Sequence, residues 1–274
     1  MNLPVLAAIS MPMASAMNNR SKVKCRGARL RLGLSLCLVF LASGCATLQP
    51  LIHDFNIVPL DQEKQLGQTM VKQIGAAKQL VSDPAPNQTV NRIGQKLVSA
   101  LPSKEFDYKF YVVQDASPNA FTIPGGTIYV HTGLLNFVDS EDELAGVLAH
   151  ELGHAYERHP AKGLSRSYGL DYLSSLVLKE NKSKLKNMAL QIAGGGILNK
   201  YGRDDENEAD EIGYRLMSRA GYSPDGMILF FKKLERLSGS NGLPAFLSTH
   251  PATPERIRRL EALKTLPQSA QSPR

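Results

Sequence analysis

Hydrophobic residues recur at helical spacing in two stretches in the first half of the chain, residues 61–80 and residues 87–101. A segment that contains two prolines separates them. Side chains three or four positions apart lie on one face of an α-helix, so each stretch predicts an amphipathic helix with one buried face. We expect the two helices to pack as a pair.

The pattern changes between residues 108 and 131. Aromatic and β-branched residues fill residues 108–114, and two further short runs, residues 120–123 and 127–131, flank Pro124-Gly125-Gly126. Short runs of this composition on either side of a turn predict strands. The sequence therefore predicts a small antiparallel sheet with one tight hairpin.

Helical spacing returns after the predicted strands. Ser140 and Glu143 form a capping box that begins a helix near residue 141, and Pro160 prevents its continuation. Further helices are predicted at residues 203–220, 224–237 and 254–263, and two flap helices at residues 168–178 and 188–198. Together these elements predict an α+β fold: a mainly helical domain with the small antiparallel sheet beside the helix that starts near residue 141.

Charge is distributed unevenly along the chain. The 274 residues carry a formal net charge of +7, and the sequence pI is about 9.3. Residues 1–44 hold six basic residues and no acidic residue, so the remainder carries only 7 − 6 = +1. Because the excess positive charge lies almost wholly in this N-terminal segment, which has the features of an export signal, we expect no nucleic-acid partner.

That basic segment resembles a bacterial export signal. An apolar run at residues 32–41 leads to Ala42-Ser43-Gly44-Cys45, small residues that resemble the cleavage site of a lipoprotein. A run of this length falls short of the ~20 residues that span a bilayer. We predict a signal peptide at residues 1–44, lipidation at Cys45, a tether at 45–57, a folded domain at 58–265 and a disordered tail at 266–274.

A metal-binding motif lies in the helix that starts near residue 141. His150 and His154 are four positions apart, in the pattern His-Glu-x-x-His, so both imidazoles stand on one face and can bind one metal ion. Glu151 lies beside the pair, where a carboxylate can act on water. Catalytic zinc takes three protein ligands and leaves one position open, so a third ligand is required.

One family of such enzymes does not fit. A metzincin would place glycine at position 157 and histidine at position 160, where this chain has Glu157 and Pro160. His159 is one position away from that pattern. We interpret it as a surface residue at the end of a helix, near the C-terminal dipole.

A second helix supplies a better third ligand. Glu206 and Asp210 are one turn apart on one face of the helix at 203–220. Glu206 would bind zinc, and Asp210 would accept the ring N–H of a zinc-binding histidine. Glu208 and Glu211 project elsewhere and are expected in solvent.

Several motifs together resemble the zinc metallopeptidase family of HtpX and the CAAX prenyl endopeptidases. The motifs are Asn119-Ala120-Phe121, Pro124-Gly125-Gly126, residues 140–145, the His-Glu-x-x-His helix, residues 203–210 and Thr249-His250-Pro251. The resemblance covers residues 58–263. The short periplasmic lipoprotein branch, with LoiP and BepA, is the most similar.

The resemblance implies roles for individual residues. It places the zinc ligands at His150, His154 and Glu206, the general base at Glu151, and the family's aspartate at Asp210. It places the strand that aligns substrate at residues 120–123. The substrate-binding residues that it implies are Asn119, Ala120, Phe121 and Arg256. His250, followed by Arg256, either stabilises the oxyanion or shields the zinc in a closed form.

Two functions follow from these expectations. The first is an active endopeptidase with one Zn²⁺ per chain that cleaves unfolded or misassembled cell-envelope proteins. Its lipid anchor would hold it to the periplasmic face of the outer membrane, since Ala46 follows the cysteine. The second is a zinc-bound chaperone or assembly factor for outer-membrane proteins that rarely cleaves. Because every residue of the metal-binding and catalytic motif is present, the sequence favours catalysis.

Overall fold

Two helices open the described part of the chain, α2 (Leu60–Ala77) and α3 (Pro84–Ser99), as their periodicity predicts. The structure is a computed structural model, and it describes residues 56–178, 182–193, 201–237 and 245–265. All of these residues belong to one unit, Pro50–Arg274. Asp83 caps α3, since its side chain accepts a hydrogen bond from the amide of Ala85 at 3.0 Å.

The sheet has three strands, β1 (Lys109–Val113), β2 (Ala120–Ile123) and β3 (Thr127–His131), in the order β1-β3-β2. The antiparallel hairpin of β2 and β3 is confirmed. Its turn depends on Gly125 and Gly126, whose φ angles of 84° and 83° would strain a side-chain-bearing residue.

The expectation of a wholly antiparallel sheet is wrong, because β1 runs parallel to β3. β3 occupies the middle of the sheet, so β1 pairs with the free edge of β3 and not with its neighbour in sequence. Asp115 lies in the connection from β1 to β2. Its backbone oxygen accepts hydrogen bonds from the Gly133 amide at 2.8 Å and from the Thr132 hydroxyl at 2.9 Å, which hold this connection against the start of α4. The sheet is therefore mixed.

The central helix is α5 (Glu141–Tyr156), which follows the short α4 (Thr132–Phe137). Ser140 accepts from the amide of Glu143 at 3.1 Å, as the capping box predicts, while Glu143 bonds the amide of Asp139. Every residue from Glu143 to Ala155 is buried. α5 is thus enclosed on all sides.

The remaining helices follow in order. They are α6 (His159–Leu178), α7 (Lys182–Ala193), α8 (Arg203–Ala220), α9 (Asp225–Leu237), α10 (Ala245–Thr249) and α11 (Pro254–Leu263). The two expected flap helices correspond to α6 and α7, although both begin several residues earlier than predicted. α4 and α10 were not predicted, since five or six residues carry too little periodicity.

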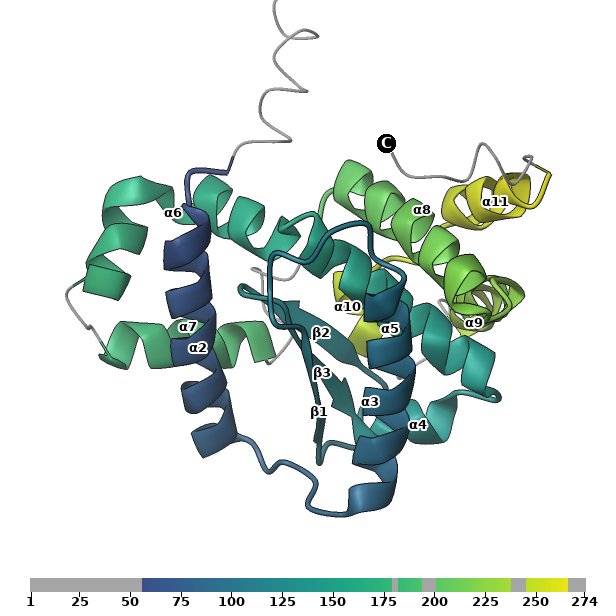
Figure 1. The fold of residues 1–274 in the computed structure, drawn as a ribbon, viewed down its shortest axis with the longest axis horizontal. Helices are drawn as coiled ribbons and strands as arrows, with labels where there is room; N and C mark the ends of the chain where they lie inside the picture. The colour runs from purple at the N-terminus through teal and green to yellow at the C-terminus, as the bar shows by residue number, and fades with distance from the viewer. Residues whose placement is uncertain (1–55, 179–181, 194–200, 238–244, 266–274) are drawn as a thin grey trace, which may run out of the picture. The chain divides into compact units, whose positions relative to one another are not determined.

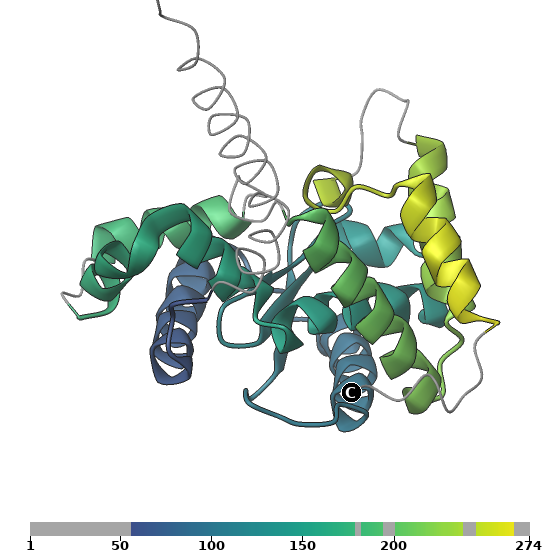
Figure 2. The same ribbon diagram turned by 90° about the horizontal axis from the view of Figure 1, so that it is seen from above.

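Helices cover both faces of the sheet (Figure 1). Phe110, Val112 and Ile128 pack with α3 and α5 on one face. Phe121 and Tyr129 pack with α2 and α7 on the other. The green α8 and yellow α11 lie on the opposite side from the blue α2 (Figure 2), and α8 packs against α5.

The contact between α5 and α8 is unusually close. An added Cβ at Gly153 would lie 2.8 Å from the backbone oxygen of Ala209, and one at Gly213 would lie 3.0 Å from the amide nitrogen of His150. The two backbones therefore meet without intervening side chains, which brings the acidic face of α8 onto the histidines of α5.

Predictions for the two ends of the chain lie outside the described residues. They are the signal peptide at 1–44, lipidation at Cys45, most of the tether and the tail at 266–274. Among the residues that the structure does describe, no helix combines the length and the apolar character that crossing a membrane requires.

Candidate metal centre

Four side chains from separate parts of the chain meet beside α5. His150 and His154 come from α5, Glu206 from the first turns of α8, and His250 from the segment just after α10. Each offers one ligand atom, these atoms lie within 4.8 Å of one another, and all four residues are buried. This group can hold a metal ion.

The spacing of the ligand atoms fits a tetrahedral ion. His150 Nε2 lies 3.1 Å from both His154 Nε2 and His250 Nδ1, and His250 Nδ1 lies 2.9 Å from Glu206 Oε1. Glu206 Oε1 lies 3.6 Å from His154 Nε2. Zinc bonds of roughly 2.0–2.1 Å in a tetrahedron place ligands about 3.3 Å apart. The donor set therefore fits zinc in spacing and in chemistry.

Both α5 histidines turn their other ring nitrogen to a fixed partner. His150 Nδ1 lies 3.0 Å from Asp210 Oδ1, the residue expected to accept the ring N–H of a metal-binding histidine. His154 Nδ1 lies 2.9 Å from His159 Nδ1. Burial holds the pKa of His154 well below its usual value, so its ring is neutral, as a metal ligand must be.

The interpretation of His159 as a surface residue is wrong, because its side chain is fully buried against His154. The chain turns back after α5, so His159 does not continue the helix into solvent. Glu208 and Glu211 are partly exposed, as expected, although Glu208 Oε2 also lies 3.1 Å from His159 Nε2.

Arg256 joins the two acidic residues of α8. Its guanidinium bonds both oxygens of Asp210 at 2.7 Å and lies 2.6 Å from Glu206 Oε2. Burial alone would favour the neutral acids, yet the charge of Arg256 holds the pKa of Glu206 well below its usual value and lowers that of Asp210. Arg256, predicted to bind substrate, is buried in this structure and faces these carboxylates.

Glu151 is held by a strand residue that sequence reasoning missed. The hydroxyl of Thr122 on β2 lies 2.8 Å from Glu151 Oε2 and 2.9 Å from the Glu151 backbone oxygen. Glu151 Oε1 is buried, makes no hydrogen bond within the described residues, and lies 3.3 Å from His250 Nε2. One oxygen is thus anchored and the other is available for a proton.

The comparison with known families agrees with this geometry. The pattern of "Peptidase family M48" matches residues 84–264, which is more than half of the chain. The chain belongs to peptidase family M48. This confirms the resemblance drawn from the motifs, and the matched region contains every residue of the metal group.

Curated relatives place the M48 chain among metalloproteases. It is 32% identical over 213 residues to the "Mitochondrial metalloendopeptidase OMA1" of Schizosaccharomyces pombe, covering 76% of this chain and 62% of the relative. It is also 32% identical over 213 residues to the "Beta-barrel assembly-enhancing protease" of Escherichia coli, covering 74% and 44%. The chain thus spans less than two thirds of the length of these relatives.

One edge of the M48 sheet is hydrogen-bonded to other segments, and the other edge is unpaired within the described residues although it is buried. Along β1, the backbone oxygen of Val112 accepts from the amide of Val81. The backbone oxygens of Phe110 and of Tyr108, just before the strand, accept from side chains of α3. On β2, Asn119 bonds β3, so Ala120 and Thr122 turn their backbone groups outward. Within the described residues those outward groups have no hydrogen-bond partner.

The residues predicted to bind substrate on this side of the sheet lie in the edge strand β2 or just before it. Asn119, Ala120 and Phe121 all have buried side chains. Met188 and Ile192 of α7 belong to the same apolar cluster as Phe121, so α7 packs beside the strand. The side chains and the backbone of β2 are therefore both buried in this structure.

Tyr201 is a further site residue that the sequence pattern did not reveal. Its ring stacks on His154 with centroids 3.9 Å apart and an angle of 19°. Burial, with the nearby charges of Glu151 and Glu206, raises its pKa well above the usual value, so the phenol stays protonated. Tyr201 covers one face of a metal-binding ring. In the sequence, the position of Tyr201 just before α8 was the only indication of this role.

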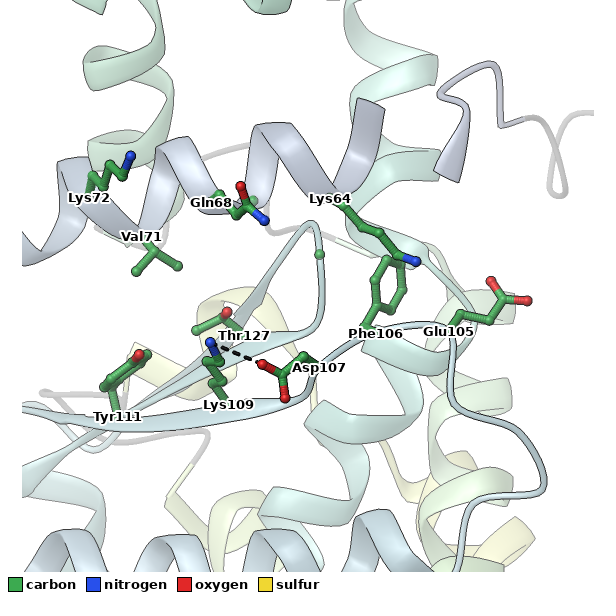
Figure 3. Close-up of a pocket in the computed structure, with 12 residues that line it drawn as sticks. Lys64, Gln68, Val71, Lys72, Glu105, Phe106, Asp107, Lys109, Tyr111 and Thr127 are labelled. Atoms are coloured by element: carbon green, nitrogen blue, oxygen red, sulfur yellow. Dashed lines mark ion pairs between the residues drawn. The ribbon is translucent and has the colours of Figure 1, made fainter. Parts of the chain in front are cut away.

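A cavity among the described residues lies in another part of the molecule. It has a volume of about 510 Å³ and lies between α2 and β1 (Figure 3). Lys64 and Lys72 of α2 line it, and Lys109 of β1 pairs with Asp107 at 3.0 Å. No residue of the metal group lines this cavity.

Proposed function

We propose that the chain is a zinc-dependent endopeptidase. The observation that carries this proposal is the position of Glu151, a buried carboxylate with one anchored and one available oxygen, beside four converging metal-ligand side chains. Membership of a peptidase family and relatives named as metalloendopeptidases support hydrolysis. Imidazole and carboxylate donors in a tetrahedral arrangement favour zinc.

Each residue contributes a separate step to peptide hydrolysis. Zinc, when bound, lowers the pKa of water from 15.7 toward ~7 and polarises the peptide carbonyl. Glu151 takes a proton from the attacking water on Oε1 and returns it to the leaving amine. Thr122 keeps the carboxylate oriented for both transfers. Asp210 holds the His150 ring in place.

The edge of β2, unpaired within the described residues, supports a preference for extended peptides once it is uncovered. Backbone pairing with Ala120 and Thr122 would bind a substrate strand irrespective of most of its side chains. A folded protein seldom offers such a strand, whereas an unfolded or misassembled one does. We therefore propose cell-envelope proteins in these states as substrates, in keeping with the "beta-barrel assembly-enhancing" relatives.

Cleavage of casein by the purified, zinc-loaded protein tests this function. Glu151→Gln should retain zinc and fold but abolish cleavage, because an amide of similar size cannot accept the proton. Glu105→Gln, at an exposed position outside the metal group, serves as the matched control and should cleave normally. Cleavage at the wild-type rate by Glu151→Gln would refute the mechanism.

His250 supports a second candidate function. Its Nδ1 lies among the ligand atoms, 3.1 Å from His150 Nε2, where it would take the position that water needs. A chain held in this state would be a zinc-bound chaperone or assembly factor. His250→Ala separates the roles: faster cleavage indicates a cap, and slower cleavage indicates an oxyanion donor.

We further propose attachment to the periplasmic face of the outer membrane through a lipid on Cys45. The small residues before Cys45 and the alanine after it support this location. Cys45→Ser should leave an unprocessed or soluble form. Recovery of the mature wild-type protein in the inner membrane would contradict the location without affecting the proposed chemistry.

A further inference from the structure

His159 joins the metal group to the acidic residues of α8. It is the first residue of α6 and is fully buried. Its Nδ1 lies 2.9 Å from His154 Nδ1, and its Nε2 lies 3.1 Å from Glu208 Oε2 and 3.7 Å from Asp205 Oδ1. Both ring nitrogens are therefore engaged, one with a metal-group histidine and one with carboxylates.

The positions of the protons follow from this geometry. His154 turns Nε2 toward His150 and Glu206, so Nε2 must be unprotonated to bind a metal. Its proton then lies on Nδ1 and is donated to His159 Nδ1. The proton of His159 must accordingly lie on Nε2, where the carboxylate of Glu208 accepts it and Asp205 Oδ1 lies 3.7 Å away. One tautomer of each ring satisfies every contact.

We propose that His159 is a positioning residue that orients His154 for metal binding and selects its tautomer. The inference rests on the proposed metal function. His150 receives the same support from Asp210, through a direct carboxylate contact at 3.0 Å. For His154 the support passes through an additional imidazole before it reaches the carboxylates. Partners of this kind strengthen a ligand's hold on its metal.

The backbone departs from regular geometry to bring His159 to this position. In a continuous helix, residue 159 would lie about 140° around the axis from residue 154, away from its ring. Arg158 instead adopts a φ of 59°, a left-handed conformation that is unfavourable for a residue with a side chain. Its guanidinium is held by Glu63 Oε2 and the Val58 backbone oxygen, each at 2.7 Å. The turn is thus stabilised from α2.

Two substitutions of His159 separate hydrogen bonding from packing. His159→Phe keeps a buried ring but removes the acceptor, whereas His159→Asn offers a side-chain oxygen near the position of Nδ1. We expect the phenylalanine variant to lose about 10–100-fold in zinc affinity, measured by chelator competition on the full chain. The asparagine variant should remain close to wild type. Visible spectra of the cobalt-loaded proteins report the same change at the metal.

A second pair of variants tests the outer carboxylate. Glu208→Ala removes the oxygen that lies 3.1 Å from His159. Glu211→Ala removes an equally exposed charge from the same helix, where its partner is Arg215. Zinc affinity should fall for the first and stay unchanged for the second. The decrease should be smaller than for His159→Phe, since Asp205 remains nearby.

The outcomes are decisive because zinc affinity and casein cleavage are measured separately. Equal zinc affinity in wild type and His159→Phe overturns the inference, as does an equal loss in the asparagine and phenylalanine variants. If melting of the metal-free protein shows that His159→Phe does not fold, the two α8 variants decide alone. A wild-type protein that binds zinc but cleaves nothing would refute the proposed function and leave the role of His159 standing.

Discussion

Replacing Arg256 by methionine tests whether its charge stabilises the buried carboxylates of Glu206 and Asp210 on α8. The Arg256 side chain is buried, contacts both Asp210 oxygens at 2.7 Å and Glu206 Oε2 at 2.6 Å, and donates to the Pro251 backbone oxygen at 2.8 Å. Methionine keeps a similar length and apolar character but removes the charge. Two buried carboxylates would then lose the guanidinium that they share.

Removing one partner of a buried ion pair costs about 3–5 kcal/mol, because the remaining charge stays desolvated. A domain of this kind has a total unfolding free energy of about 5–15 kcal/mol. We therefore expect Arg256→Met to lose about 4 kcal/mol in the metal-free protein at pH 7. Bound zinc would offset part of that loss, since it would neutralise Glu206.

The loss should depend on pH in a defined direction. Arg256 holds the pKa values of Glu206 and Asp210 below those of the unfolded chain. Groups with a lowered pKa stabilise the fold above their unfolded value of about 4, and this stabilisation is lost as the pH falls through the folded value. The methionine variant lacks this contribution. Its deficit should therefore be largest near neutral pH and shrink in acid.

Urea unfolding of the metal-free protein at several pH values measures this difference. Arg258→Met, on the exposed side of the same helix, is the matched control and should change the unfolding free energy by less than about 0.5 kcal/mol. A loss for Arg256→Met no larger than that of the control, or a deficit that grows in acid, would show that Arg256 does not compensate the carboxylates.

Gly153→Ala should destabilise the protein by about 1–3 kcal/mol and reduce its zinc content, because the added methyl group pushes α8 away from α5. Thermal melting and metal analysis test this. Gly75→Ala, where an added Cβ meets nothing within 4 Å, should instead raise stability by about 0.5–1 kcal/mol. Thr122→Val removes one charge-assisted hydrogen bond to Glu151, so it should lower kcat about tenfold and leave the zinc content unchanged. Glu206→Gln should lose metal and Glu208→Gln should retain it, since glutamine can still accept from His159; the reverse result in metal analysis would overturn the helix register.

The sequence by itself determined the features that depend on local periodicity. Four-residue spacing in a helix places His150 beside His154, and Glu206 beside Asp210, whatever the rest of the chain does. The hairpin around Gly125 is equally local, since the turn and both strands are contiguous in sequence. These elements were predicted correctly because their geometry needs no distant partner.

Only the tertiary structure decided which distant residues meet these elements. The parallel pairing of β1 with β3, the burial of His159, and the contact of Thr122 with Glu151 each join segments whose approach no local pattern specifies. His159 is the clearest case, because one left-handed residue, Arg158, turns it from the solvent to the metal group. Periodicity describes a face within one element, whereas the packing of separate elements, and the desolvation that follows, depends on the whole chain at once.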